Sequence, residues 1–350
     1  MPILDTDIAE IAGRLAAEAA PFAGRDVLVT GGAGFLGRYL VAVFQKLNRD
    51  VLDRPCRLRV LDNFRTAAGT EMAVGDPDIV FERADVIQPY LTDRPVDYVI
   101  HAAGIASPFY YRKYPLETLD VATVGTRNLL ELARQKGARF TFMSSSEIYG
   151  DPDPKHVPTP ESYRGHVASL GPRACYDEGK RVGETLCYIF HDSFGVHTNI
   201  IRPFNVFGPG MSETDYRVLP NFASRIKGGL PLQVYGDGRQ TRTYCYVTDA
   251  LVGMLKVVLS GVAGEAYNIG NPAPEISVLD LVKRIEQVLG RRVSHNAIEY
   301  PDSYPEDEPN RRCPDIRKAR LQLDYEPAVT LEDGLDRFLR WADGAYRGVQ

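Results

Sequence analysis

The chain has 350 residues, of which 44% are hydrophobic and 25% are charged, and its formal net charge is −5. This composition is typical of a folded globular protein of about two domains and excludes a disordered, collagen-like or disulfide-stapled chain. No apolar run reaches the roughly 20 residues of a membrane-spanning helix, and no stripe of Lys and Arg suggests nucleic-acid binding. We therefore expect neither a membrane nor a nucleic acid as a partner.

The five cysteines are scattered and odd in number, and the six histidines show no HxxxH pattern. We therefore expect no disulfide framework, no metal site and a reducing, cytoplasmic compartment. Near the N-terminus, residues 5–20 combine alanines with four acidic residues and one Arg. They predict an extra helix packed on the surface, capped by Asp5 or Thr6, instead of a targeting peptide.

Short runs rich in β-branched residues alternate with helical patterns through the first 200 residues. They predict strands over residues 26–30, 57–61, 79–81, 97–101, 139–144 and 198–202, with helices that include residues 116–135 and 176–192. Strand–helix alternation of this kind predicts an α/β fold with a doubly wound parallel sheet, the Rossmann architecture that binds dinucleotides.

The pattern changes after residue 203, where loops rich in Gly, Pro and Asp dominate (209–216, 235–242, 271–275 and 300–314). Helices are predicted near residues 219–227, 278–289 and 331–346. We expect an N-terminal helix over 1–23, a dinucleotide-binding domain over 24–202 and a smaller α+β substrate domain over 203–350. Some segments of the last part are expected to return to the first domain.

The strand at 26–30 runs directly into a glycine-rich turn. Gly31, Gly34 and Gly37 follow GxxGxxG spacing and precede a helix expected to begin near Arg38. Glycines at such positions permit a sharp turn, close approach of the backbone to a pyrophosphate, and tight helix packing. The positive end of the helix favours the phosphates.

Acidic residues follow the next two strands. Asp62 ends the second strand, where a carboxylate binds ribose hydroxyls and repels a 2′-phosphate, so we expect NAD rather than NADP. Arg65 leaves NADP open as the lesser alternative. Asp85, after the third strand, is expected to receive the adenine amino group.

Tyr176 and Lys180 are spaced i,i+4 at the start of a helix, so both side chains project from one face. A nearby ammonium and the positive nicotinamide ring are expected to lower the pKa of Tyr176 toward the working pH, making it a base for a sugar hydroxyl. Ser145 follows a strand at the edge of the sheet where ligands bind, and it would complete a Ser–Tyr–Lys unit.

These segments, with residues 101–103 and 202–209, resemble the extended short-chain dehydrogenase/reductases that act on nucleotide sugars, over residues 24–345. The likeness is strongest to the UDP-glucuronate decarboxylases. GPRACYDEGKR at 171–181 and SEIYG at 146–150 are similar to that subfamily's segments. The resemblance implies oxidation of the sugar at C4 with NAD, loss of CO₂ and reduction to a UDP-pentose. It also implies a homodimer formed through the helices at 116–135 and 176–192.

By the same resemblance, Tyr176 takes the proton of the 4-hydroxyl and Glu147 acts near C5 and the carboxylate, while Arg242 and Arg312 grip the pyrophosphate. Further cofactor contacts are expected from Phe35, Leu36, Asn63, Val86, Ala102, Ala103, Pro203 and Val206. Further substrate contacts are expected from Ser107, Tyr111, Ser146, Asn205, Arg217, Val234 and Tyr235.

The chain departs from the subfamily pattern in several places. Ser145 stands where Thr is usual, Gly104 and Ile105 alter the wall near the nicotinamide, and Gly210 replaces an Arg. A 4-epimerase, including one acting on UDP-glucuronate, therefore remains an alternative. A 4,6-dehydratase is a further alternative, although Ser146 stands where that enzyme places an Asp.

Overall fold

The central element is a seven-stranded parallel sheet in the order β11-β6-β5-β4-β1-β2-β3. The computed structural model describes residues 4–67, 75–215, 217–299 and 309–349. Its sheet strands are β1 (Asp26–Thr30), β2 (Arg57–Asp62), β3 (Ile79–Arg83), β4 (Tyr98–His101), β5 (Arg139–Met143), β6 (Thr198–Pro203) and β11 (Glu265–Ile269). The six predicted strands are all present, within two residues at each end, and the predicted α/β class is confirmed.

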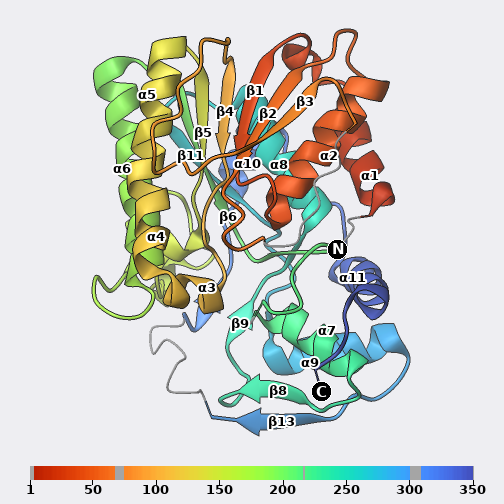
Figure 1. The fold of residues 1–350 in the computed structure, drawn as a ribbon. Coiled ribbons are helices and arrows are strands. Elements are labelled where there is room, and N and C mark those ends of the chain that lie inside the picture. Colours follow the sequence, from red (N-terminus) through yellow and green to blue (C-terminus); the bar gives the residue numbers. More distant parts are fainter. Residues whose placement is uncertain (1–3, 68–74, 216, 300–308, 350) are drawn as a thin grey trace.

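Helices cover both faces of the sheet (Figure 1). One side carries α1 (Asp5–Leu15), α2 (Phe35–Asp50) and α8 (Val247–Ser260), and the other carries α4 (Pro115–Asp120), α5 (Thr126–Lys136) and α6 (Ala174–Phe194). A π-helical turn, Val121–Gly125, joins α4 to α5, so the predicted helix at 116–135 is one interrupted helix. All residues of β1 are buried, which explains the continuous apolar run in its sequence.

Much of the chain after residue 203 forms the lower region in Figure 1. Its helices are α7 (Val218–Lys227), α9 (Val278–Leu289) and α11 (Leu331–Ala345), close to the predicted ranges, and α3 (Pro108–Lys113) and α10 (Arg317–Leu323) border the sheet. Short strands pair as β8 (Leu232–Tyr235) with β13 (His295–Ile298), β9 (Thr241–Arg242) with β12 (Ile276–Ser277) and β14 (Arg311–Arg312), and β7 (Val206–Phe207) with β10 (Cys245–Tyr246).

Two elements from this later part return to the sheet, and neither was predicted individually. β11 pairs in parallel with β6 and closes one edge. α8 is buried along nearly its whole length. A helix buried on all sides lacks the one-sided apolar period that identifies an amphipathic helix, so the sequence pattern does not reveal it.

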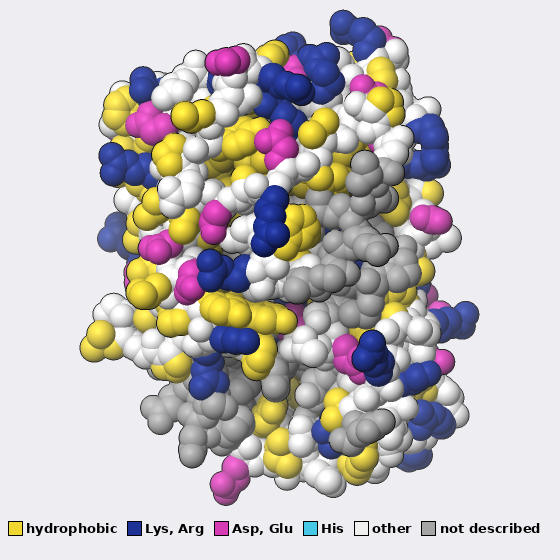
Figure 2. Space-filling model, in the orientation of Figure 1, with side chains coloured by type: hydrophobic (Ala, Val, Ile, Leu, Met, Phe, Trp, Pro, Cys, Tyr) yellow, Lys and Arg dark blue, Asp and Glu magenta, His cyan; other side chains and the backbone are white. Residues whose placement is uncertain are grey.

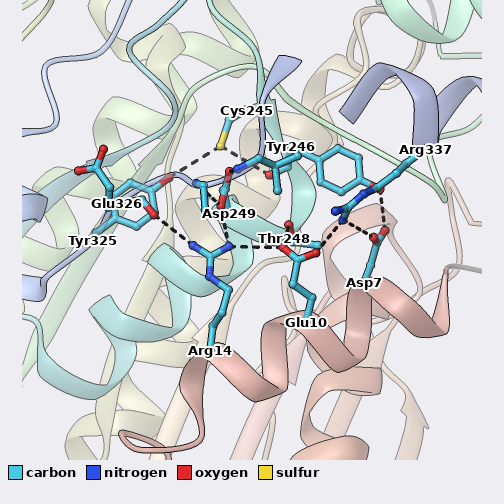
Figure 3. Close-up of polar contacts among 12 residues, drawn as sticks. Asp7, Glu10, Arg14, Cys245, Tyr246, Thr248, Asp249, Tyr325, Glu326 and Arg337 are labelled. Atoms are coloured by element: carbon cyan, nitrogen blue, oxygen red, sulfur yellow. Dashed lines mark hydrogen bonds and ion pairs between the residues drawn. The ribbon is translucent and has the colours of Figure 1, made fainter. Parts of the chain in front are cut away.

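Helix α1 begins at Asp5 after Leu4, with no side-chain cap, so the predicted cap at Asp5 or Thr6 is wrong. The helix is also more than a surface addition, because its apolar face is buried and its polar residues reach two other helices. Figure 3 shows Asp7, Glu10 and Arg14 of α1 in contact with residues of the α8 and α11 regions. The helix therefore joins the sheet to the lower part of the molecule.

Lys and Arg side chains are interspersed with Asp and Glu over the face drawn in Figure 2. This surface pattern agrees with the small net charge of the sequence. None of the helices within the described residues combines the length and hydrophobicity needed to cross a membrane.

Candidate active site

A cavity of about 830 Å³ lies at the carboxyl ends of the sheet strands and extends into the lower part of the molecule. Every residue predicted to bind the cofactor lines it: Gly31, Gly34, Phe35, Leu36, Gly37, Asp62, Asn63, Asp85, Val86, Ala102, Ala103, Tyr176, Lys180, Pro203 and Val206. The carboxyl edge of a parallel sheet is where ligands bind in such folds. The described residues hold no group of His, Cys, Asp and Glu that fits a metal ion.

The glycine-rich turn leaves the backbone open toward this cavity. Gly31 has φ +75°, and a Cβ there would lie 2.6 Å from the Cα of Ala103. A Cβ on Gly37 would lie 2.0 Å from the carbonyl oxygen of Gly31, so only glycine lets α2 pack this close. Helix α2 starts at Phe35, earlier than predicted, and its free N–H groups face the turn. This cradle fits the pyrophosphate of a dinucleotide.

Asp62 at the end of β2 lines the cavity and supports the glycine turn. Its Oδ2 accepts a hydrogen bond from the Ala33 N–H at 2.9 Å, and its Oδ1 accepts one from Phe64 at 2.7 Å. Nearby, Asn63 donates to Asp85 at 3.0 Å. An acidic side chain at this point of the fold fits ribose hydroxyls, so the described residues are suited to NAD.

Arg38, in the first turn of α2, connects this turn to the segment that follows residue 209. Its Nε donates to the Gly34 carbonyl at 3.4 Å, and its Nη2 donates to the carbonyl of Gly210. The same segment continues to Arg217, which lines the cavity and pairs with Asp215 at 2.5 Å. One side chain thus links the cofactor turn to the segment that leads to Arg217.

Tyr176 and Lys180 lie together at the cavity wall, as the i,i+4 spacing predicts. Lys180 Nζ donates to the Met143 carbonyl at 2.6 Å and lies 5.8 Å from the centre of the Tyr176 ring. Burial raises the pKa of Tyr176 to about 12, while the interaction with Ser145 works in the opposite direction. Burial lowers the pKa of Lys180 to about 8. Burial alone therefore raises the tyrosine pKa, and the lowering expected from the ammonium and a bound nicotinamide ring stays a prediction.

The Glu147 carboxylate is held by two guanidinium groups. Arg312 binds it through both terminal nitrogens, at 2.5 and 2.6 Å, and Arg173 Nη2 contacts its Oε2. Ser145 caps the short turn Ser146–Tyr149 by accepting a hydrogen bond from the Glu147 N–H at 3.2 Å. Glu147 and Tyr176 line the same cavity, which places a carboxylate and a phenol around one ligand space.

The arginines expected to bind pyrophosphate have protein partners. Arg312 faces Glu147, and Arg242 donates to the carbonyls of Pro309 and Asn310 at 2.6 and 3.2 Å. Both line the cavity together with the other predicted substrate residues Tyr111, Ser146, Asn205, Arg217 and Tyr235. Asn205 also donates to the Thr243 carbonyl at 2.8 Å, which fixes it beside the Arg242 strand.

Two predicted substrate residues do not line the cavity. Val234 has its side chain in the hydrophobic core, because alternate residues of β8 face opposite sides and its neighbours Gln233 and Tyr235 face the cavity. Ser107 precedes α3, and its hydroxyl is buried without a partner among the described residues. The cavity lining therefore includes neither Val234 nor Ser107, and their contact with substrate stays a prediction.

Several lining residues were missed, and Arg173 is the most informative of them. It is 7% exposed and binds both Glu147 and Asp177. It belongs to the GPRACYDEGKR segment, three residues before Tyr176. That position next to a predicted base is the signal that could have identified it.

Comparison with known proteins covers nearly the whole chain. The model of the NAD dependent epimerase/dehydratase family matches residues 27–270. UDP-glucuronic acid decarboxylase 1 of Xenopus tropicalis is 42% identical over 317 residues, which cover 90% of this chain and 71% of that protein. UDP-glucuronic acid decarboxylase 1 of Arabidopsis thaliana is 39% identical over 315 residues, or 89% of this chain and 68% of that protein.

Several solved structures are also similar to this chain over most of its length. The UDP-glucuronic acid 4-epimerase of Bacillus cereus, in complex with UDP-glucuronic acid and NAD, is similar with a TM-score of 0.77 and 26% identity over 92% of this chain and 100% of that chain. A dTDP-glucose 4,6-dehydratase of Streptomyces venezuelae with NAD bound has a TM-score of 0.79 and 26% identity over 92% and 99%. Since the family model spans more than half of the chain, the protein belongs to the NAD-dependent epimerase/dehydratase family.

Proposed function

We propose that the protein is a UDP-glucuronate decarboxylase that converts its substrate to a UDP-pentose through a 4-keto sugar. The observation that carries the proposal is the Glu147 carboxylate, held between Arg173 and Arg312 in the cavity wall that also presents Tyr176. The 42% identity to a UDP-glucuronic acid decarboxylase over most of the chain supports it.

The residues present suit each step of this reaction. Bound NAD⁺ supplies a hydride acceptor that is reduced and then reoxidised within one cycle. Tyr176 takes the proton from the 4-hydroxyl, with Lys180 and Ser145 beside it. The ketone at C4 makes the C6 carboxylate that of a β-keto acid, so the C5–C6 bond breaks, CO₂ leaves and the electron pair forms an enolate. Glu147 supports these later steps, in which C5 receives a proton.

The cheapest test separates decarboxylation from epimerisation. The protein is incubated with UDP-glucuronate and NAD⁺, and CO₂ release is followed together with formation of the 4-epimer. We expect CO₂ and a UDP-pentose. Formation of UDP-galacturonate without CO₂ would replace the proposal with the 4-epimerase alternative.

The Glu147→Gln variant tests the role of the carboxylate. Oxidation at C4 needs only the proton relay and the hydride acceptor, so it is retained, while the steps at C5 and C6 slow by ~10²- to 10⁴-fold. Reduced cofactor, detected by its absorbance at ~340 nm, and a 4-keto sugar therefore accumulate. Glu178→Gln, on the outer face of α6 beside Arg181, is the matched control and behaves as wild type.

We also propose a homodimer through the face formed by α4, α5 and α6. Apolar side chains are exposed there, among them Leu116, Val124, Val182, Tyr188 and Ile189. A patch of this kind on paired helices suits a two-fold contact between copies. Light scattering at micromolar concentration is expected to give twice the monomer mass, and a monomer would refute the contact.

We also propose that the protein is located in a reducing compartment such as the cytoplasm. All five cysteines are free thiols, and four of them are buried. Thiol alkylation of the protein in freshly lysed cells is expected to find no disulfide, and an oxidised pair would contradict this assignment.

A further inference from the structure

Four charged side chains meet behind Glu147. Arg173 Nη2 contacts Glu147 Oε2, and Arg173 Nε lies 3.3 Å from Asp177 Oδ2. Arg312 binds Glu147 from the opposite side with both terminal nitrogens. The four side chains are between 7% and 18% exposed, so their mutual attraction is weakly screened. Two cations and two anions thus form one array in the cavity wall.

Arg173 connects this array to the proposed base. Its backbone carbonyl accepts hydrogen bonds from the N–H groups of Tyr176 at 2.9 Å and Asp177 at 3.1 Å, at the start of α6. Its guanidinium reaches Glu147, which lies in a different element. Arg312 lies in β14, so its contact with Glu147 does not connect Glu147 to α6. Arg173 is therefore a direct side-chain link between the Glu147 carboxylate and the start of α6, which carries the phenol.

Asp177 orients Arg173. Its Oδ2 receives the Arg173 Nε–H, while its Oδ1 is buried without a partner among the described residues. A half-satisfied buried carboxylate is a poor way to stabilise a fold, so its presence needs another explanation. Asp177 can hold the guanidinium of Arg173 in the orientation that reaches Glu147, which explains its presence.

The charge on Asp177 changes near neutral pH. Burial and the neighbouring Glu147 raise its pKa to about 7, against the opposite effect of Arg173 and Arg312. Tyr176 and Cys175 also face it, and both are electrically neutral while their protons are bound. Below about pH 7 Asp177 is protonated, and Arg173 loses one of its two ionised partners.

We propose that Arg173 is a positioning residue that sets the Glu147 carboxylate against the reacting sugar, and that Asp177 holds Arg173 in place. This inference rests on the proposed decarboxylase function. It assigns Arg173 and Asp177 to the steps after oxidation, since their side chains bind each other and the Glu147 carboxylate, which acts near C5.

The test compares the two halves of the reaction in Arg173→Gln. Single-turnover formation of reduced cofactor with UDP-glucuronate stays within about threefold of wild type, whereas CO₂ release falls at least tenfold. The double variant with Glu147→Gln releases CO₂ no more slowly than Glu147→Gln alone, because both changes disable the same Arg173–Glu147 interaction. Arg181→Gln is the matched control. It lies on the same helix and contacts the Ile148 carbonyl at 3.0 Å without touching the Glu147 carboxylate, and it releases CO₂ normally.

Asp177→Asn gives an independent readout if Arg173→Gln folds poorly. In wild type, CO₂ release per reduced cofactor formed falls as pH drops below about 7, whereas in Asp177→Asn this ratio is low and lacks the inflection. Arg173→Lys keeps the positive charge but loses the planar guanidinium with its several donors, so it restores part of the rate of CO₂ release.

Three outcomes would overturn the inference. The first is normal CO₂ release by both Arg173→Gln and Asp177→Asn. The second is multiplicative loss in the double variant. The third is an equal loss of both half-reactions, which indicates a merely structural role. A wild type that releases no CO₂ would overturn the proposed function, and this inference with it.

Discussion

Burial sets the protonation of the two residues closest to the proposed chemistry. It raises the pKa of Tyr176 to about 12 and lowers that of Lys180 to about 8. Tyr176 is therefore a phenol at neutral pH, and its phenolate grows tenfold with each pH unit. Above about pH 8 the Lys180 ammonium is lost, and with it the charge that favours the phenolate.

This protonation pattern predicts the pH dependence of the first half-reaction. Formation of reduced cofactor from UDP-glucuronate in a single turnover is expected to rise with pH up to about 8 and then to level off or fall. Tyr176→Phe abolishes it at every pH. The control is Tyr90→Phe, whose hydroxyl donates to Glu82 at 2.8 Å outside the catalytic helix, and which leaves the profile unchanged. A Tyr176→Phe protein that still reduces the cofactor would refute the assignment of the base.

Asp62 has two tasks, because it lines the cofactor cavity and also accepts hydrogen bonds from the glycine turn. Asp62→Ala is expected to weaken NAD binding by more than tenfold and to reduce the preference for NAD over NADP. Titration of each cofactor against the variant measures both effects. Unchanged selectivity would show that the carboxylate does not meet the ribose.

Arg242 and Arg312 are expected to respond differently to removal, although both were predicted to bind pyrophosphate. Arg242 lies beside Asn205 in the cavity, and Arg242→Ala should mainly raise KM. Arg312 holds Glu147 through two hydrogen bonds, so Arg312→Ala should also lower kcat. Steady-state kinetics with UDP-glucuronate separates the two effects, and equal changes in both variants would contradict this division.

The cofactor residues could be predicted because they lie in one contiguous motif. Gly31, Gly34 and Gly37 follow a strand and precede a helix, and that local order determines their geometry. The array around Glu147 could not be predicted in the same way. Arg173 is 26 positions away from Glu147 and Arg312 is 165 positions away, so only the folded chain brings them together.

Among the secondary-structure elements, α1 shows how strongly an added helix is fixed. Arg14 Nη1 lies 2.6 Å from Asp249 Oδ1 on α8 (Figure 3). The same carboxylate accepts the N–H groups of Ala328 and Val329 at 2.9 Å. Asp7 accepts hydrogen bonds from the hydroxyls of Tyr39 and Tyr246. Arg14 also donates to the Glu326 carbonyl at 3.1 Å, so the helix contacts α2, α8 and the segment before α11.

Arg14→Ala tests this connection, because it leaves the fully buried side chain of Asp249 without its cation. Since Arg14 itself is about a quarter exposed, we expect a loss of about 2 kcal/mol in the free energy of unfolding. Arg49→Ala removes an exposed arginine that pairs with its neighbour and serves as the control. Chemical denaturation measures both variants, and equal stabilities would show that α1 is not fixed by this contact.

The outer elements of the sheet also show where sequence patterns fail. The strands β1 to β6 are short apolar runs within a regular strand–helix alternation, so their positions could be predicted. β11 and α8 come after that alternation has ended. Their place is decided by contacts with β6 and α1, which lie far away in the sequence.

On the scale of the whole molecule, the chain crosses repeatedly between the sheet and the lower region. In the sequence, α8 and β11 come between α7 and α9. In the fold, α8 and β11 belong to the sheet layers, whereas α7 and α9 belong to the lower region. Unfolding of either region therefore disrupts the packing of the other. We expect a single cooperative transition in place of two.

The single tryptophan makes this prediction measurable. Trp341 is buried in α11 of the lower region, so its fluorescence reports that region alone. Its unfolding midpoint in urea is expected to coincide with that of far-ultraviolet circular dichroism, which is dominated by the sheet and its helices. A fluorescence transition that clearly precedes the loss of circular dichroism would show independent regions.

The bridge made by Arg38 has a thermodynamic consequence. Because this side chain holds both the Gly34 carbonyl in the cofactor turn and the Gly210 carbonyl in the segment that leads to Arg217, we expect cofactor and substrate binding to be coupled. Linkage is reciprocal, so the factor by which cofactor tightens substrate binding equals the factor by which substrate tightens cofactor binding. An enzyme that must retain its cofactor until the keto sugar is reduced gains from this coupling, since the intermediate itself strengthens the hold on the nucleotide.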